Sequence, residues 1–259
     1  MLAVGLWLAV SIAVAAQGEP KKAKAPMQAE RSSMLALGHT DILDTYLSQE
    51  TFRGTELRYT AQSLRQRVGS KISREMSHHI LLSSAGTRGN KNSLLTAMYN
   101  FKAGWYRVWK LADPDINIRI GGLTDATLGG PYNTRISNYP AQALISLSVN
   151  PAGSVSWQFH AGTKPLTFNY EVSMPLIGLA FSPNYGQSYY EIFSEGNYDH
   201  NIVVTSPFSA PQLYQRLTLD FKLWRTTLSM GYMGDIRQMK ANSLKYHQYT
   251  HAIVLGWKY

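Results

Sequence analysis

The sequence of 259 residues contains no cysteine, and this absence excludes several classes of protein at once. Disulfide frameworks, cysteine-containing zinc sites and cysteine nucleophiles all need thiols. Charged residues are also scarce, at 16% of the chain, whereas usual domains have roughly 25%. Hydrophobic residues make up 44% and aromatic residues 12%, with 16 Tyr and 6 Trp. Because disordered chains need high charge and few aromatics, we expect a folded protein that buries a large apolar surface.

Long hydrophobic runs are missing too, apart from one near the start of the sequence. Residues 2–16 are uncharged and apolar over 15 positions, while a membrane-spanning helix needs about 20. The run ends in small residues with Gln17 next, which is typical of a secretory signal peptide cleaved near Ala16, although no Lys or Arg precedes it. The sequence therefore predicts an exported protein, with residues 1–16 as its signal peptide and no membrane helix further along.

Residues 17–53 contain a basic cluster of Lys21, Lys22 and Lys24 among Ala, Pro, Gln and Ser. We interpret this segment as an N-terminal periplasmic linker. Contact of the lysines with lipid phosphates is the alternative.

From residue 54 to residue 259 the hydrophobic pattern repeats every two residues. Alternation is strictest in 166–177, 213–223 and 227–237, each with one apolar and one polar face over about ten positions. Weaker alternation covers 55–62, 76–84, 94–106, 116–126, 141–149, 154–160 and 249–259. This gives ten strands if Asn150-Pro151-Ala152-Gly153 separates two of them, because proline lacks a donor for a central ladder. Eight and twelve strands are the alternatives.

Strand length separates a membrane barrel from a soluble sandwich. Sandwich strands usually have about five or six residues, but several here have about ten, the length that crosses a bilayer at a tilt. Aromatics such as Tyr249 and Trp257 stand at the ends of apolar faces, like the interfacial girdles of membrane barrels. The last residues, with Ile253, Leu255 and Trp257 on one face before Tyr259, match the C-terminal segment of outer-membrane barrels.

The predicted fold is therefore all-β, a single antiparallel up-and-down transmembrane β-barrel in the outer membrane of a Gram-negative cell, in contact with outer-membrane lipid. Residues 161–165 and 223–227 have the length of short periplasmic turns. Residues 183–211 and 238–247 are predicted to be long extracellular loops.

Charged side chains fall on the predicted inward faces. They are Glu56, Arg58, His79, Lys102, Arg119, Asp125, Glu171, Arg216, Asp220, Lys222, Asp235, Arg237 and Lys258. About eight strands leave an interior just wide enough for side chains to fill, so ten strands should be largely plugged by ion pairs. We expect the charge network to comprise Arg58, Arg119, Asp125, Glu171, Arg216, Asp220, Asp235 and Arg237. Such mixed signs do not form the basic surface that nucleic acid needs.

The loop 183–211 is the most distinctive stretch, since it has no Lys or Arg but contains Glu191, Glu195 and Asp199 in a protein of net charge +9. Together with 238–247 it suggests a site for an extracellular ligand or protein. The candidate binding residues are Tyr189, Tyr190, Glu191, Asn197, Asp199, His200, Asn242, Lys245 and His247. The alternative, which we favour, is that the long loop folds into the mouth and caps the lumen.

Three segments resemble an uncharacterised family of small outer-membrane barrel proteins typical of Bacteroidetes. They are Tyr46-Leu47-Ser48, Gly186-Gln187-Ser188-Tyr189-Tyr190-Glu191-Ile192-Phe193 and Asn242-Ser243-Leu244-Lys245-Tyr246-His247. The likeness extends from about residue 40 to the end. It implies the location and the barrel architecture but no activity.

Catalysis has little support in the sequence. Ser77 and His79 share one face of a strand, but no acid partner is evident. His78 and His79 point to opposite faces, so they cannot bind one metal ion, and we expect neither a metal nor a cofactor. Our first interpretation is a non-catalytic outer-membrane barrel, with a lipid-acting hydrolase or acyltransferase and a narrow solute channel as alternatives.

Overall fold

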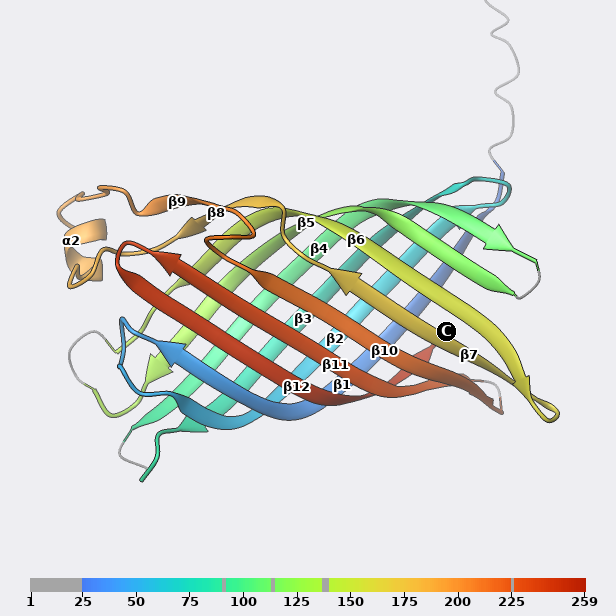
Figure 1. Cartoon of the computed structure of the whole chain (residues 1–259), viewed down its shortest axis with the longest axis horizontal. Helices are drawn as coiled ribbons and strands as arrows, with labels where there is room; N and C mark the ends of the chain where they lie inside the picture. Colours follow the sequence, from blue (N-terminus) through green and yellow to red (C-terminus); the bar gives the residue numbers. More distant parts are fainter. Residues whose placement is uncertain (1–24, 90–91, 113–114, 137–139, 225) are drawn as a thin grey trace, which may run out of the picture.

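The computed structural model describes residues 25–89, 92–112, 115–136, 140–224 and 226–259. Ten long strands form a closed antiparallel barrel (Figure 1), in the order β5-β4-β3-β2-β1-β12-β11-β10-β7-β6, and pairing of β5 with β6 completes the ring. The predicted all-β, ten-stranded antiparallel barrel is confirmed. The expected signal peptide lies outside the described residues. Within the described ranges, no helix has the length and apolarity needed to cross a membrane.

The barrel strands are β1 (Met27–Asp44), β2 (Phe52–Arg67), β3 (Ile72–Gly86), β4 (Ser93–Leu111), β5 (Ile116–Asn133), β6 (Leu144–Ala161), β7 (Lys164–Ser173), β10 (Gln212–Leu223), β11 (Thr226–Ala241) and β12 (Leu244–Lys258). Between β7 and β10 lie β8 (Ile177–Phe181), the short helix α2 (Tyr189–Phe193) and β9 (Ile202–Thr205). Figure 1 shows these three at one end of the barrel, which we call the mouth. Strand β1 begins and β12 ends at the opposite end, the terminal end.

Two strand assignments from the sequence are wrong. One strand was missed and another was divided in two, so the predicted number of strands is still ten. Residues 27–44, assigned to a periplasmic linker within 17–53, form β1 and pair with both β2 and β12. The barrel therefore begins at Met27 rather than at residue 54. Conversely, β6 runs unbroken through Asn150-Pro151-Ala152-Gly153, where two strands were expected.

The connections follow the expected pattern except at one hairpin. The links around 161–165 and 223–227 are short and lie at the terminal end, between β6 and β7 and between β10 and β11. The loop predicted at 238–247 does not exist, because β11 and β12 continue to a two-residue turn. Asn242 and Ser243 form that turn with φ of 49° and 63°. Positive φ at both positions is the geometry that a tight hairpin requires.

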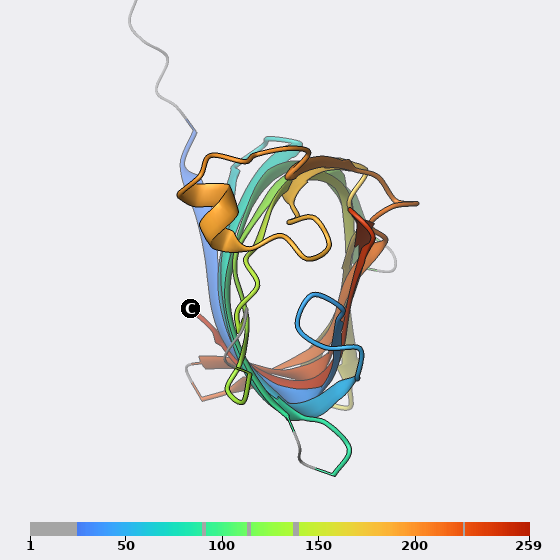
Figure 2. The same cartoon turned by 90° about the vertical axis from the view of Figure 1, so that its left-hand side faces the viewer.

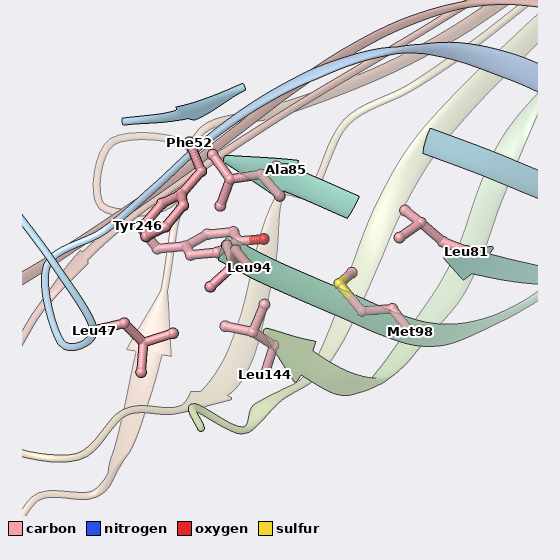
Figure 3. Close-up of a cluster of buried hydrophobic side chains, with 9 residues drawn as sticks. Leu47, Phe52, Leu81, Ala85, Leu94, Met98, Leu144 and Tyr246 are labelled. Carbon is pink, nitrogen blue, oxygen red and sulfur yellow. The ribbon is translucent and has the colours of Figure 1, made fainter. Parts of the chain in front are cut away.

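Alternation along each strand separates a filled interior from an apolar exterior. In β4, Leu94, Met98 and Lys102 are buried inside, while Leu95 and Trp105 are exposed on the outer face. Near the mouth the interior is apolar, and its side chains come from β1, β2, β3, β4, β6, β12 and the loop after β1 (Figure 3). The cluster consists of Ile42, Leu47, Phe52, Leu81, Ala85, Leu94, Met98, Leu144 and Tyr246. It is a small hydrophobic core inside the barrel.

Truncation within this core should destabilise the barrel. Phe52 is 0% exposed, so Phe52→Ala should cost about 3–5 kcal/mol of unfolding free energy through lost burial and a residual cavity. The control is Leu57→Ala on the outer face of the same strand, which should cost clearly less. Urea unfolding in phospholipid vesicles, followed by tryptophan fluorescence, measures both. Equal losses would contradict a packed core at the mouth.

Candidate functional site

The centre of the lumen is occupied by a buried ion network that connects β2 with β11. The Arg58 guanidinium donates to Glu56 Oε1 from Nε (3.0 Å) and to Asp235 Oδ2 from Nη1 (2.6 Å). Arg237 donates to the same Asp235 oxygen from Nη2 at 2.9 Å. Thr250 and Gln248 donate to Glu56 Oε2 at 2.6 and 3.1 Å. Each buried charge therefore has both an ionic partner and hydrogen bonds, which burial of charge requires.

Further ion pairs extend the network along the lumen. Lys102 lies 3.5 Å from Asp125 and 4.0 Å from the centroid of the Tyr214 ring. Arg216 contacts Glu171 at 2.6 Å. Near the terminal end, Lys258 contacts both Asp220 (2.7 Å) and Glu30 (2.8 Å).

Seven of the eight predicted network residues are ion-paired. The pairs are Asp235 with both Arg58 and Arg237, Glu171 with Arg216, Asp125 with Lys102, and Asp220 with Lys258. Arg119 differs, because its Nε donates to the Ser154 hydroxyl at 2.8 Å.

Sequence reasoning missed polar partners at two places in the network. Gln62 joins Glu75 to Arg216, with contacts of 2.8 and 2.5 Å. Extending the alternation of 76–84 by one residue would have placed Glu75 on the inward face. Glu30 was missed because its segment was assigned to a linker.

Two loops meet over the mouth (Figure 2). The loop after β1 and the segment before α2 project into the opening from different sides. The Tyr46 hydroxyl donates to the Gln187 carbonyl at 3.0 Å, and the rings of Tyr46 and Tyr189 pack edge to face at 5.9 Å. The Tyr189 hydroxyl accepts a hydrogen bond from the Ala143 backbone N–H at 2.6 Å. The two loops that project into the mouth are therefore bonded to one another.

Residues 182–201, which we call the cap loop, have an internal hydrogen-bond framework centred on Gln187. Its Oε1 accepts from the Asn184 backbone N–H (3.0 Å) and the Asn201 side chain (2.7 Å), and its Nε2 donates to the Asn197 carbonyl (3.0 Å). Helix α2 begins with a capping box between Ser188 and Glu191. These bonds give a loop outside the barrel wall a defined shape.

The predicted binding residues of the cap loop divide into structural and exposed groups. Tyr189 is half-buried between Phe181 and Phe193 with ring centroids 6.2 and 6.1 Å away. Glu191 serves the capping box, and Asn197 contributes its carbonyl to Gln187. Tyr190, Asn197, Asp199 and His200 are exposed, and Asp199 contacts His200.

The predicted residues of the second loop lie on β12 and in the β11–β12 turn. The Asn242 side chain donates to the carbonyls of Ser182 (2.8 Å) and His200 (3.0 Å), so it fastens the cap loop to the hairpin. The Lys245 backbone pairs with Thr45. His247 lies on the outer face against Tyr249, with ring centroids 5.9 Å apart. The structure thus joins Asn242 to the cap loop but leaves His247 on the barrel exterior.

The one Ser–His pair that the sequence placed on a strand face does not form a hydrolase triad. The Ser77 hydroxyl lies 3.2 Å from His79 Nε2, but His79 Nδ1 bonds the Thr60 hydroxyl (3.0 Å) where a hydrolase would place an acid or amide. The described chain also contains no group of three or more His, Cys, Asp or Glu able to hold a metal ion.

Asp44 is a buried acid at the end of β1 near the mouth. The outer face of β1 becomes polar at His39 and Asp41, and Asp44 lies closer to the mouth than these two residues. Burial raises its pKa to about 7, against the opposing effect of the backbone N–H groups of Tyr46 and Leu47. Burial also raises the pKa of the Tyr189 phenol to about 12. Both groups are therefore uncharged in mildly acidic medium.

Comparison with known families identifies this chain at the level of a family. A model described as DUF3316, protein of unknown function, matches residues 2–258, so the chain belongs to that family. No curated protein matches the sequence.

Solved structures of similar architecture are outer-membrane proteins. The outer membrane protease OmpT of Escherichia coli aligns with a TM-score of 0.48 and 7% identity over 90% of this chain and 96% of its own. The transport unit of the autotransporter AIDA-I, also from Escherichia coli, aligns at 0.47 and 5% identity over 97% of each chain. Neisserial surface protein A aligns at 0.35 and 8% identity over 90% and 97%. Likeness at this level says nothing about activity.

Asp44 should make stability depend on pH. In the unfolded chain it ionises near its ordinary value of 3.8, but in the folded chain only near pH 7. Between those values the folded state binds more protons, so stability falls as pH rises, by up to about 4 kcal/mol. Asp44→Asn should remove the loss of unfolding free energy that Asp44 causes between pH 4 and pH 7.

Urea unfolding of both proteins at several pH values from 4 to 8 measures the difference. Asp41→Asn, on the outer face of the same strand, is the matched control. Parallel curves for wild type and Asp44→Asn would show that Asp44 does not carry the effect.

Proposed function

We propose that this protein is a non-catalytic outer-membrane barrel with a closed lumen, which presents the cap loop as a recognition surface outside the cell. The observation that carries the proposal is the dual role of the cap loop. It covers the mouth through Gln187 and Tyr189, yet Tyr185, Tyr190 and Tyr198 are 69, 67 and 62% exposed.

The outer face of the barrel supports a membrane location. Exposed large apolar side chains occupy nine of the ten barrel strands, all except β7, and include Leu82 of β3, Ile120 of β5 and Leu147 of β6. Towards the terminal end, Arg74 lies over the Trp105 ring at 5.9 Å, and Arg107 over Trp109 at 5.5 Å. Tryptophan beside arginine at the edge of an apolar band is typical of a lipid headgroup interface.

The connections at the two ends of the barrel differ in length, and this difference supports one orientation of the barrel in the membrane. Barrels of the outer membrane have short periplasmic turns and longer extracellular loops. The terminal end has the short turns, so the mouth and the cap loop face outward. Origin in Bacteroidetes remains a prediction from the sequence resemblance.

The lumen gives less support to the two alternatives. A channel needs a water path past Arg119, Arg216 and Arg237, but Arg216 and Arg237 are ion-paired within the lumen. A cavity of about 760 Å³ opens at the terminal end and reaches Arg119. A lipid-acting enzyme needs a nucleophile, a base and an orienting group, and the described residues do not assemble one.

Charge narrows the kind of ligand that suits the cap loop. Glu195 and Asp199 are exposed in a segment without Lys or Arg, which disfavours anionic partners. Exposed tyrosines on a fixed loop offer flat contact area at low entropic cost. A neutral or amino sugar, with apolar ring faces and hydroxyl donors, fits this surface.

The test is binding of the purified, detergent-solubilised protein to a glycan array. We expect binding to neutral or amino glycans that is lost in the triple variant Tyr185→Ser, Tyr190→Ser, Tyr198→Ser. The matched control is Tyr132→Ser, an exposed tyrosine on β5. Array binding unaffected by the triple variant, or no glycan binding at all, would contradict the proposal.

A further inference from the structure

The barrel wall is interrupted near the mouth, where the pairing of two adjacent strands shifts. Strand β7 pairs with β10 up to Ser173↔Tyr214, and pairing resumes between β8 and β9 at Gly178↔Thr205. Four residues on one side, 174–177, therefore oppose eight on the other, 206–213. The extra residues cannot join the ladder in register, so the sheet must open between the two pairings.

The backbone bonds around this shift show which edges remain unpaired. Residues 206–209 form a turn, with Ala210 N–H donating to the Ser206 carbonyl at 2.8 Å. Residues 209–211 then continue β10 along β11, since the carbonyls of Ser209 and Pro211 accept from Lys240 and Gln238, each at 2.9 Å. In the described chain, β9 pairs with β8 alone.

The wall is thus open between the β8–β9 hairpin and residues 209–213, a break that we call the seam. Pro175 lies at its base, between Met174 and Leu176, which both donate to β6. Because proline has no N–H, it cannot donate a ladder bond at this point.

A cavity of about 80 Å³ lies behind the seam. Pro175, Thr205 and Ala210 from the edges of the seam line it, together with apolar side chains of the inner core such as Met98 and Leu144. The cavity therefore extends from the break in the wall to the inside of the barrel.

Arg237 supplies the charged group of this cavity. Its Nε and Nη2 bind Asp235, and the described residues offer no hydrogen-bond partner to Nη1. A guanidinium with free donor capacity in a cavity lined by both apolar and uncharged polar residues is suited to a carboxylate.

The surface outside the seam is strongly apolar. Phe208, in the turn at its edge, is 97% exposed. The exposed neighbours are Met174, Leu176, Ile177, Leu179, Ile202 and Val204. In a membrane this surface contacts acyl chains, so a molecule that enters the seam comes from lipid.

We propose that the seam is a lateral entrance and that the cavity behind it binds a single-chain amphiphile with a carboxylate head, of the fatty-acid class. The carboxylate lies on Arg237. A cavity of about 150 Å³ accommodates benzene, so this smaller one holds the head and the first carbons, and the rest of the chain leaves through the seam. The inference rests on the proposed membrane location but not on the recognition role of the cap loop.

Binding is tested by isothermal titration of dodecanoate into the full-length protein in an uncharged detergent. Dodecanol is the probe that lacks the carboxylate head, and acetate is the probe that lacks the long alkyl chain. Dodecanoate should bind at least tenfold more tightly than either. Arg237→Gln should weaken dodecanoate binding at least tenfold, while Arg119→Gln, a lumen arginine outside the cavity, should leave it unchanged.

A second variant keeps the test valid if loss of Arg237 disrupts folding. Ala180→Leu fills the cavity without touching an ion pair and should also abolish dodecanoate binding. Equal binding of dodecanoate and dodecanol, or unchanged binding by Ala180→Leu, would overturn the proposal.

The absence of native cysteine permits a direct test of the entrance. In vesicles, Ala210→Cys should react with a membrane-soluble maleimide and be protected by dodecanoate. Reaction only with a charged, water-soluble maleimide would overturn lateral entry. If the protein enters vesicles but fails these tests, only this inference is wrong. If it does not enter vesicles, the proposed function fails as well.

Discussion

The ion pair between Arg58 and Asp235 is the interaction on which the rest of this structure depends. It joins β2 to β11 across the lumen, and the Arg58 side chain is only 2% exposed. A charge so buried is tolerated only with ionic partners and full hydrogen bonding, and loss of one partner typically costs about 3–5 kcal/mol. Glu56 gives Arg58 a second ionic partner, and Arg237 does the same for Asp235. The same contacts that satisfy the charges also fill the centre of the barrel.

The sequence predicted the architecture well because strict alternation survives wherever one face meets lipid and the other the lumen. It failed for β1, where small or polar residues such as Ala36 and Thr40 face inward and His39 and Asp41 face outward, so neither face is clearly apolar. It also failed at Pro151. The Pro151 carbonyl accepts from Met174, and the carbonyl and N–H of a strand residue point the same way. The N–H that proline lacks would therefore point toward residues 174–176, between β7 and β8, where the ladder along β6 is already interrupted.

The candidate site was only partly predictable. The charged positions on inward faces follow from parity, but their partners depend on which strands face each other across the lumen, and no local pattern gives that. Asn242 illustrates the limit. The sequence placed it in a long loop, whereas a two-residue turn carries its side chain to Ser182 and His200. The shift in register that creates the seam likewise depends on pairing between distant strands.

Single-channel recording in planar bilayers tests the closed lumen most directly. Purified wild-type protein, with insertion verified independently, should leave the conductance of the bilayer unchanged, because the Glu56–Arg58–Asp235–Arg237 network and the capped mouth occupy the water path. Discrete steps of hundreds of picosiemens from the same preparation would contradict this account.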